Sequence, residues 1–126
     1  MLFKRIPLYI KISSNKIEVT NLTSGKTISK ISPQEFSTKR VVIADFNIIA
    51  SLINETIKEL FGKRFFPVQL KVLIQQVEYV EGGLAEIEKR ALRDLGYQAG
   101  ASLVTIVEHN RRLSDQEAVL ELGLSN

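Results

Sequence analysis

The sequence predicts an α/β domain built on one mixed five-stranded sheet. Segments that alternate polar and apolar residues open the chain. Two stretches with helical apolar spacing follow, each ahead of an apolar segment typical of a buried strand. The expected element order is therefore β-β-β-α-β-α-β-α. An antiparallel meander followed by right-handed crossovers would place all the strands in one sheet, with helices on its faces.

The first three strands are expected to form the meander, because period-two alternation between turn-forming residues is typical of half-buried antiparallel strands. The strands are expected at residues 8–13, 16–22 and 26–31. Ser14-Asn15 and Thr23-Ser24-Gly25 supply the turns, and residues 33–40 are expected to form a loop.

The first helix is expected to begin near residue 46. Apolar side chains at spacings of 3, 4, 4 and 3 predict one buried helical face, made of Phe46, Ile49, Ile53, Ile57 and Leu60. Asp45 or Asn47 can cap its amino end, and Gly62 is a typical stop signal.

The rest of the chain predicts strand, helix, strand and helix. The strands are expected at residues 69–75 and 103–107. Gly82-Gly83 opens the second helix, which ends at Gly96 or Gly100. The apolar face of that helix is expected to consist of Leu84, Ile87, Ala91 and Leu95. Ser114-x-x-Glu117 is a capping box and predicts the last, short helix.

Composition limits the chemistry. The 126 residues include no cysteine and one histidine, which excludes disulfide scaffolds, thiolate zinc sites, cysteine nucleophiles and multi-histidine metal sites. No apolar run approaches the ~18 residues of a membrane span. We expect a soluble cytoplasmic protein with one domain over residues 1–126, divided into an N-terminal tip at 1–7, a meander at 8–32 and a helix-strand-helix-strand-helix unit at 41–124.

Charge is unevenly placed along the chain. Residues 1–40 carry eight cations and two acidic residues, a net charge of +6, whereas the whole chain carries +3. Lysines that protect exposed strand edges explain this pattern better than a nucleic-acid surface does, since few aromatic side chains lie among the cations.

Four segments, in the same order along the chain, resemble segments of MreB-type bacterial actins. They are Val42-Ile43-Ala44-Asp45-Phe46, Glu86-Ile87-Glu88-Lys89-Arg90-Ala91-Leu92-Arg93-Asp94, Ala99-Gly100-Ala101-Ser102-Leu103-Val104-Thr105-Ile106-Val107-Glu108 and Ala118-Val119-Leu120-Glu121-Leu122-Gly123-Leu124. The resemblance covers residues 8–124 and implies a single ribonuclease H-like half-domain, the unit from which actin-type ATPase folds are built.

The departures from the family pattern bear on function. MreB-type actins carry an Asp-Leu-Gly-Thr phosphate turn, and the equivalent turn here is Ile12-Ser13-Ser14-Asn15, with neither carboxylate nor glycine. The resemblance thus implies a degenerate phosphate turn at Ser13, Ser14 and Asn15. The family's second phosphate turn and adenosine contacts belong to a second half that lies beyond this sequence. We therefore expect no cofactor, no metal site and no enzymatic activity.

The resemblance leaves one candidate catalytic residue. Glu88 matches a family glutamate near the terminal phosphate of the nucleotide, and its alternative interpretation is a solvated helix charge near Arg90 and Arg93. A ribonuclease H-type nuclease would need clustered carboxylates, for which Asp45, Glu78, Glu88 and Asp94 are available. The first strand, however, offers only Ser13 and Ser14 where such nucleases place their first aspartate.

Two smaller motifs have simpler interpretations. Gly82-Gly83 lacks the Lys-Ser/Thr of a P-loop and is expected to be a flexible turn. His109, next to Glu108, could act as a switch or base but is expected to be a surface residue.

The function hypothesis is a non-catalytic MreB-like half-domain that works by protein–protein association with a partner or a second copy, in cell shape or the cytoskeleton. One alternative is an ATP-binding protein that completes its site by dimerising or with a partner chain. A second alternative is nucleic-acid binding through the basic face. The apolar and then basic start, Met1–Arg5, could contact a membrane or cover a core edge, so membrane association stays open.

Overall fold

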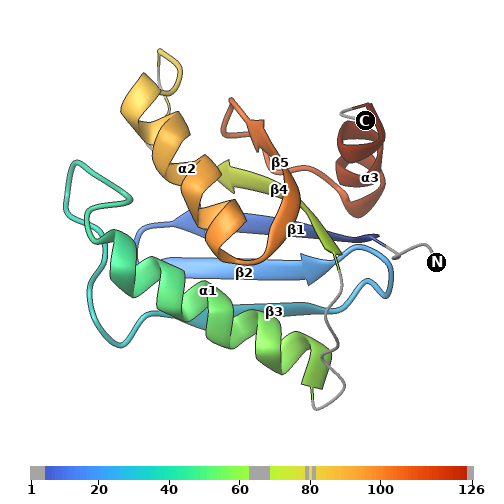
Figure 1. Ribbon diagram of the computed structural model, residues 1–126. Coiled ribbons are helices and arrows are strands. Elements are labelled where there is room, and N and C mark those ends of the chain that lie inside the picture. The colour runs from blue at the N-terminus through green and yellow to red at the C-terminus, as the bar shows by residue number, and fades with distance from the viewer. Residues whose placement is uncertain (1–4, 63–68, 79, 81, 125–126) are drawn as a thin grey trace.

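Five strands form one mixed sheet in the order β3-β2-β1-β4-β5 (Figure 1). The figure shows a computed structural model, which describes residues 5–62, 69–78, 80 and 82–124. The strands are β1 (Arg5–Ser13), β2 (Lys16–Asn21), β3 (Thr27–Ile31), β4 (Gln69–Gln76) and β5 (Ala101–Val107). β1, β2 and β3 pair antiparallel, whereas β1 with β4 and β4 with β5 pair parallel. The predicted α/β fold class, with one mixed five-stranded sheet and the element order β-β-β-α-β-α-β-α, is confirmed.

Helices cover the two faces of the sheet unequally. The helices are α1 (Phe46–Phe61), α2 (Glu86–Gln98) and α3 (Asp115–Leu124). α1 and α2 pack on one face and enclose the main core with Leu8, Ile10 and Ile12 of β1. α3 packs on the opposite face, where Tyr9 of β1 lies in a smaller buried cluster with residues of α3. β1 is therefore buried on both faces, as expected for a central strand.

α1 follows its sequence signals. The Asp45 side chain accepts a hydrogen bond from the Ile48 amide at 3.2 Å, which caps the helix, and Gly62 ends it with a φ of 65°. Ile49, Ile53, Ile57 and Leu60 are buried against the sheet, as the apolar spacing predicts.

The predicted apolar face of α2 is wrong at two positions, because the helix begins at Glu86 and not directly after Gly82-Gly83. Leu84 is buried but lies ahead of the helix, and Ile87 is 78% exposed, while Leu92, Leu95 and Gly96 are turned toward the sheet. The helix continues past Gly96. The stop is at Gly100, which has a φ of 103°.

β1 and β5 begin earlier than predicted, by three and two residues. Residues 5–7, expected to belong to the N-terminal tip, are part of β1 because they pair with β4, and residues 1–4 lie outside the described residues. The N–H and the carbonyl of a strand residue point to the same side. The Pro7 carbonyl accepts from the Leu22 amide at 2.9 Å, so position 7 faces a residue just beyond the end of β2. The N–H that proline lacks is therefore missing beyond the ladder to β2 and not within it.

Among the described residues, no helix is both long and apolar enough to cross a bilayer.

Gly96 lets α2 approach β5 closely, and this contact yields a stability prediction. A Cβ atom at residue 96 would lie 2.6 Å from Cγ2 of Val104, a β-branched side chain with little rotamer freedom. Overpacking costs about 1–3 kcal/mol, whereas replacing a helical glycine by alanine gains about 1 kcal/mol. We expect Gly96→Ala to lower the free energy of unfolding by about 1 kcal/mol in a urea titration.

Gly123→Ala in α3 is the matched control, since nothing lies within 4 Å of the point that a Cβ atom would occupy at residue 123. This variant is expected to be as stable as the parent or slightly more stable. A Gly96→Ala protein that unfolds at the same urea concentration as Gly123→Ala would contradict the close approach.

Candidate functional site

The turn between β1 and β2 lies where the resemblance to actins predicts a phosphate turn. Ser13 ends β1 and pairs with Lys16, so Ser14 and Asn15 alone connect the two strands. Asn15 has a φ of 54°, a left-handed conformation that asparagine tolerates better than most residues. The carboxyl end of β4 lies beside this turn, because β1 and β4 are parallel partners.

Asn15 binds the loop that leads to α1. Its side-chain oxygen accepts hydrogen bonds from the amides of Phe36 and Ser37 at 2.8 and 2.9 Å. Its own amide donates to the Ser37 hydroxyl at 3.1 Å, and that hydroxyl donates to the Val42 carbonyl. Phe36, Ser37 and Val42 are buried, so the turn and the loop form one packed unit.

A carboxylate of the chain itself lies at the turn. The Ser14 amide donates to Oε1 of Glu78, two residues past β4, at 2.5 Å. A hydrogen bond between an amide and a carboxylate is charge-assisted and short. The Ser14 hydroxyl is buried and lacks a hydrogen-bond partner within the described part of the chain. Both turn amides, those of Ser14 and Asn15, are thus already bonded.

Glu88 belongs to the same region as Glu78, and its carboxylate also accepts hydrogen bonds. It is the third residue of α2, and its carboxylate accepts from the Ala85 amide at 2.8 Å, which satisfies a free N–H at the helix start. Its other oxygen is 3.4 Å from Nε2 of the buried Gln76, which also donates to the Glu78 carbonyl at 2.9 Å. The structure thus brings Ser14, Glu78 and Glu88 into one hydrogen-bonded region.

The other carboxylates considered for a nuclease do not join this region in a metal-binding arrangement. Asp45 caps α1, and Asp94 lies exposed on α2. Over residues 5–62, 69–78, 80 and 82–124, no three His, Asp or Glu side chains are placed to hold a metal ion.

The two remaining motifs are part of loops. Gly82 and Gly83 both have positive φ, and the Gly83 amide bonds to the Val80 carbonyl at 2.9 Å. Glu108 pairs with Lys89 at 2.9 Å, while Nδ1 of His109 accepts from the Arg111 amide at 3.1 Å. Glu108 and His109 therefore have separate partners.

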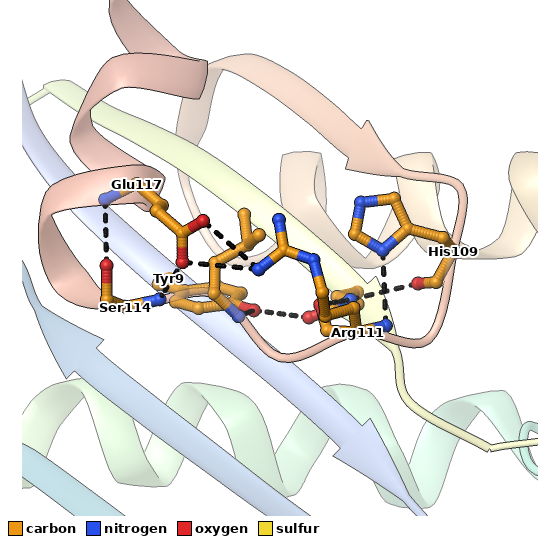
Figure 2. A network of polar contacts seen from close by, with 7 residues as sticks. Tyr9, His109, Arg111, Ser114 and Glu117 are labelled. Carbon is orange, nitrogen blue, oxygen red and sulfur yellow. Dashed lines mark hydrogen bonds and ion pairs between the residues drawn. The ribbon is translucent and has the colours of Figure 1, made fainter.

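A buried polar network on the α3 face was not predicted from the sequence (Figure 2). The Tyr9 hydroxyl donates to Oε1 of Gln75 and accepts from the Leu113 amide at 3.1 Å. Nε2 of Gln75 donates to the carbonyls of His109 and Arg111 at 2.9 and 2.8 Å. Burial raises the pKa of the Tyr9 hydroxyl, so the group stays a neutral donor. The glutamine pair Gln75-Gln76, directly after the apolar run Val72-Leu73-Ile74, is the signal that could have pointed to this network.

The network continues into the start of α3. Arg111 reaches Glu117 at 3.1 Å, and Ser114 and Glu117 form the predicted capping box, with bonds of 2.9 and 3.1 Å. The amide of Ser114 and the guanidinium of Arg111 hold the pKa of Glu117 below its usual value. The network therefore attaches residues 109–117 to the sheet.

Comparisons with known proteins give one family relationship. No protein-family model matches the chain. The chain is 30% identical over 102 residues to the uncharacterized protein YjaA of Escherichia coli strain K12, covering 77% of each chain.

A comparison with solved structures finds weak similarity to two structures of the Ppx/GppA family from Aquifex aeolicus. The Ppx/GppA enzyme is 19% identical with a TM-score of 0.46, and the type II variant of the phosphatase is 17% identical with a TM-score of 0.44. Each similarity covers 82% of this chain and 36% of the other, so the chain spans about a third of the length of those structures.

The Tyr9 hydroxyl gives a prediction for the α3 network. Tyr9→Phe would leave the buried Leu113 amide and Gln75 oxygen without their partner, which costs about 1–3 kcal/mol. We expect a lower free energy of unfolding by urea and faster hydrogen exchange at the Leu113 amide. Tyr97→Phe, at a tyrosine that is 48% exposed, is the control and should leave both quantities unchanged. Equal stability of the two variants would show that the Tyr9 hydroxyl contributes nothing.

Proposed function

The chain belongs to the family of the Escherichia coli protein YjaA, and on that premise we propose that it is a non-catalytic, actin-like domain that works by protein–protein association. The observation that carries the proposal is the hydrogen bond from the Ser14 amide to the Glu78 carboxylate. It bears directly on whether this turn can hold a nucleotide.

A phosphate at this turn would meet two obstacles. It would need free backbone amides, and those of Ser14 and Asn15 donate to Glu78 and Ser37. It would also approach the negative charge of Glu78, which disfavours a second anion nearby. The two turn residues, Ser14 and Asn15, include neither a glycine, which would let a phosphate approach the backbone closely, nor a lysine, which would bind it. These features support a domain that does not bind nucleotide here.

β5 offers the best surface for association. It is an edge strand of seven residues, Ala101–Val107, without any charged side chain. A long, uncharged edge strand is a template for pairing with another strand. Five of its seven residues are only partly buried, so they are accessible to a partner. An added strand would bond through its backbone and place alternate side chains against both faces.

The opposite edge is less suited to strand addition. β3 has five residues, and its Lys30 forms an ion pair with Glu59 of α1. Charged side chains on an edge oppose pairing with another sheet. We therefore assign the association to β5, with a second copy of the chain as the partner. Two β5 strands would pair across a two-fold axis, the usual symmetry of a dimer.

The cellular role in this proposal follows the resemblance to MreB-type actins. Four segments of the sequence match that family in order, so we propose a role in cell shape or the cytoskeleton. Membrane contact through Met1–Arg5 stays a prediction, since residues 1–4 lie outside the described part of the chain.

Nucleotide binding is tested by calorimetric titration of the protein with ATP and magnesium. We expect no saturable heat, because the turn amides are bonded and Glu78 repels phosphate. Saturable binding by the parent protein would contradict a non-catalytic role and favour the ATP-binding alternative.

Association is tested by sedimentation velocity over a range of protein concentrations. We expect a dimer whose population rises with concentration. Thr105→Lys places a charge in the middle of β5 and should shift the population to monomer. Ser29→Lys places the same charge in the middle of the exposed edge strand β3 and should leave the dimer intact. A parent protein that stays monomeric at all concentrations, or equal effects of both variants, would contradict association through β5.

A further inference from the structure

A basic hollow lies at the amino ends of β1 and β4, on the face that α3 covers. It has a volume of about 340 Å³ and is lined by Arg5, Pro7, Lys71, Val119, Leu122 and Gly123. Arg5 and Pro7 come from β1, Lys71 from β4 and the rest from α3. Pockets for small ligands in proteins begin at about 300 Å³, so the hollow can hold a small molecule.

Lys71 is the unusual residue of this hollow. It lies in a central strand, it is 8% exposed, and no carboxylate or other hydrogen-bonding group of the described chain pairs with it. Burial lowers the pKa of its ammonium, and the nearby Arg5 lowers that pKa further. The lysines at 11, 30 and 89, by contrast, each have a carboxylate within 4 Å.

The stem of Lys71 is buried, and its ammonium has no carboxylate partner among the described residues. The guanidinium of Arg5 nearby adds repulsion between two cations. Among the described residues, Arg5 forms a hydrogen bond through Nε alone, 3.4 Å from Oε1 of Gln69, so its terminal nitrogens are available. An anion in the hollow would relieve the repulsion between the two cations.

The walls of the hollow favour an anion that carries an apolar chain. Pro7, Val119 and Leu122 supply apolar surface, and Gly123 adds no side chain. Val119 also borders a second hollow of about 440 Å³, lined with Leu22, Asp115, Gln116 and Leu120. Val119 and Leu120 are 46% and 66% exposed, so an apolar chain could continue along this part of α3.

The donors of the hollow favour a carboxylate over a phosphate. Phosphate sites usually combine cations with backbone amides or hydroxyl groups, which bond its several oxygens. The described residues that line this hollow include no serine or threonine. One guanidinium and one ammonium match the two oxygens of a carboxylate.

We propose that the hollow binds a small aliphatic carboxylate, with its carboxylate between Lys71 and Arg5 and its chain against Pro7, Val119 and Leu122. This binding site lies on the α3 face and is separate from the turn at Ser14 and from any pairing of β5. It requires neither nucleotide binding nor association.

The test is an NMR titration of the ¹⁵N-labelled protein with octanoate. We expect saturable shifts of amide signals in β1, β4 and α3. Acetate has the carboxylate without the chain, and 1-octanol has the chain without the carboxylate. We expect both to bind at least tenfold more weakly than octanoate.

Two variants and a control locate the site. Lys71→Met keeps the length of the side chain and removes its charge, and it should weaken octanoate binding at least tenfold. Val119→Asp changes a partly exposed wall residue and should weaken binding by charge repulsion, so it tests the site even where Lys71→Met fails to fold. Lys58→Met, at an exposed position of α1 on the opposite face of the sheet, should bind like the parent.

Three outcomes would overturn the proposal. The first is the absence of saturable shifts at millimolar octanoate. The second is equal affinity for octanoate and for acetate or 1-octanol, which would mean that the hollow does not recognise an anion and a chain together. The third is unchanged affinity in both Lys71→Met and Val119→Asp.

Discussion

The parallel pairing of β1 with β4 is the constraint on which the rest of the structure depends. Its register places Arg5 opposite Gln69, Pro7 opposite Lys71 and Tyr9 opposite Leu73. Because side chains alternate between faces, the same register turns Leu8, Ile10 and Ile12 toward α1 and α2 and turns Tyr9 toward α3. A slip by one residue would exchange the faces and expose the main core, so the hydrophobic pattern of both strands holds this register.

Three polar regions of the molecule are consequences of that pairing. At the carboxyl ends it brings the Ser14 amide to Glu78, in the middle it brings the Tyr9 hydroxyl to Gln75, and at the amino ends it brings Arg5 and Pro7 to Lys71. The three regions differ in how far their polar groups are satisfied. Glu78 and Gln75 have partners within the chain, whereas Lys71 has none among the described residues. Partnered polar groups stabilise a fold, and two cations side by side without a carboxylate indicate where an anion could bind.

Local patterns in the sequence account for the elements and for little of the polar chemistry. The spacing of Ile49, Ile53 and Ile57 predicts α1, and the Ser114–Glu117 capping box predicts α3, because these signals lie within a few residues of each other. The face of α2 was wrong at Ile87, because the helical phase depends on where the helix starts, and two glycines before it obscure that point. The partners Glu78 and Ser14 lie 64 residues apart, so only the strand register brings them together.

The candidate residues taken from the resemblance to actins illustrate the same limit. Ser14 and Glu88 do lie in one region, as the topology requires, yet their bonding depends on Glu78, Gln76 and Ala85, which no family motif singles out. A turn with the right position in a fold can therefore hold a phosphate in one protein and an internal carboxylate in another. In this chain the turn between β1 and β2 holds the negatively charged carboxylate of the side chain that follows β4, Glu78. Lys71, near the other end of the same strand, has Arg5 beside it and no carboxylate partner among the described residues, which is why we propose an external anion there.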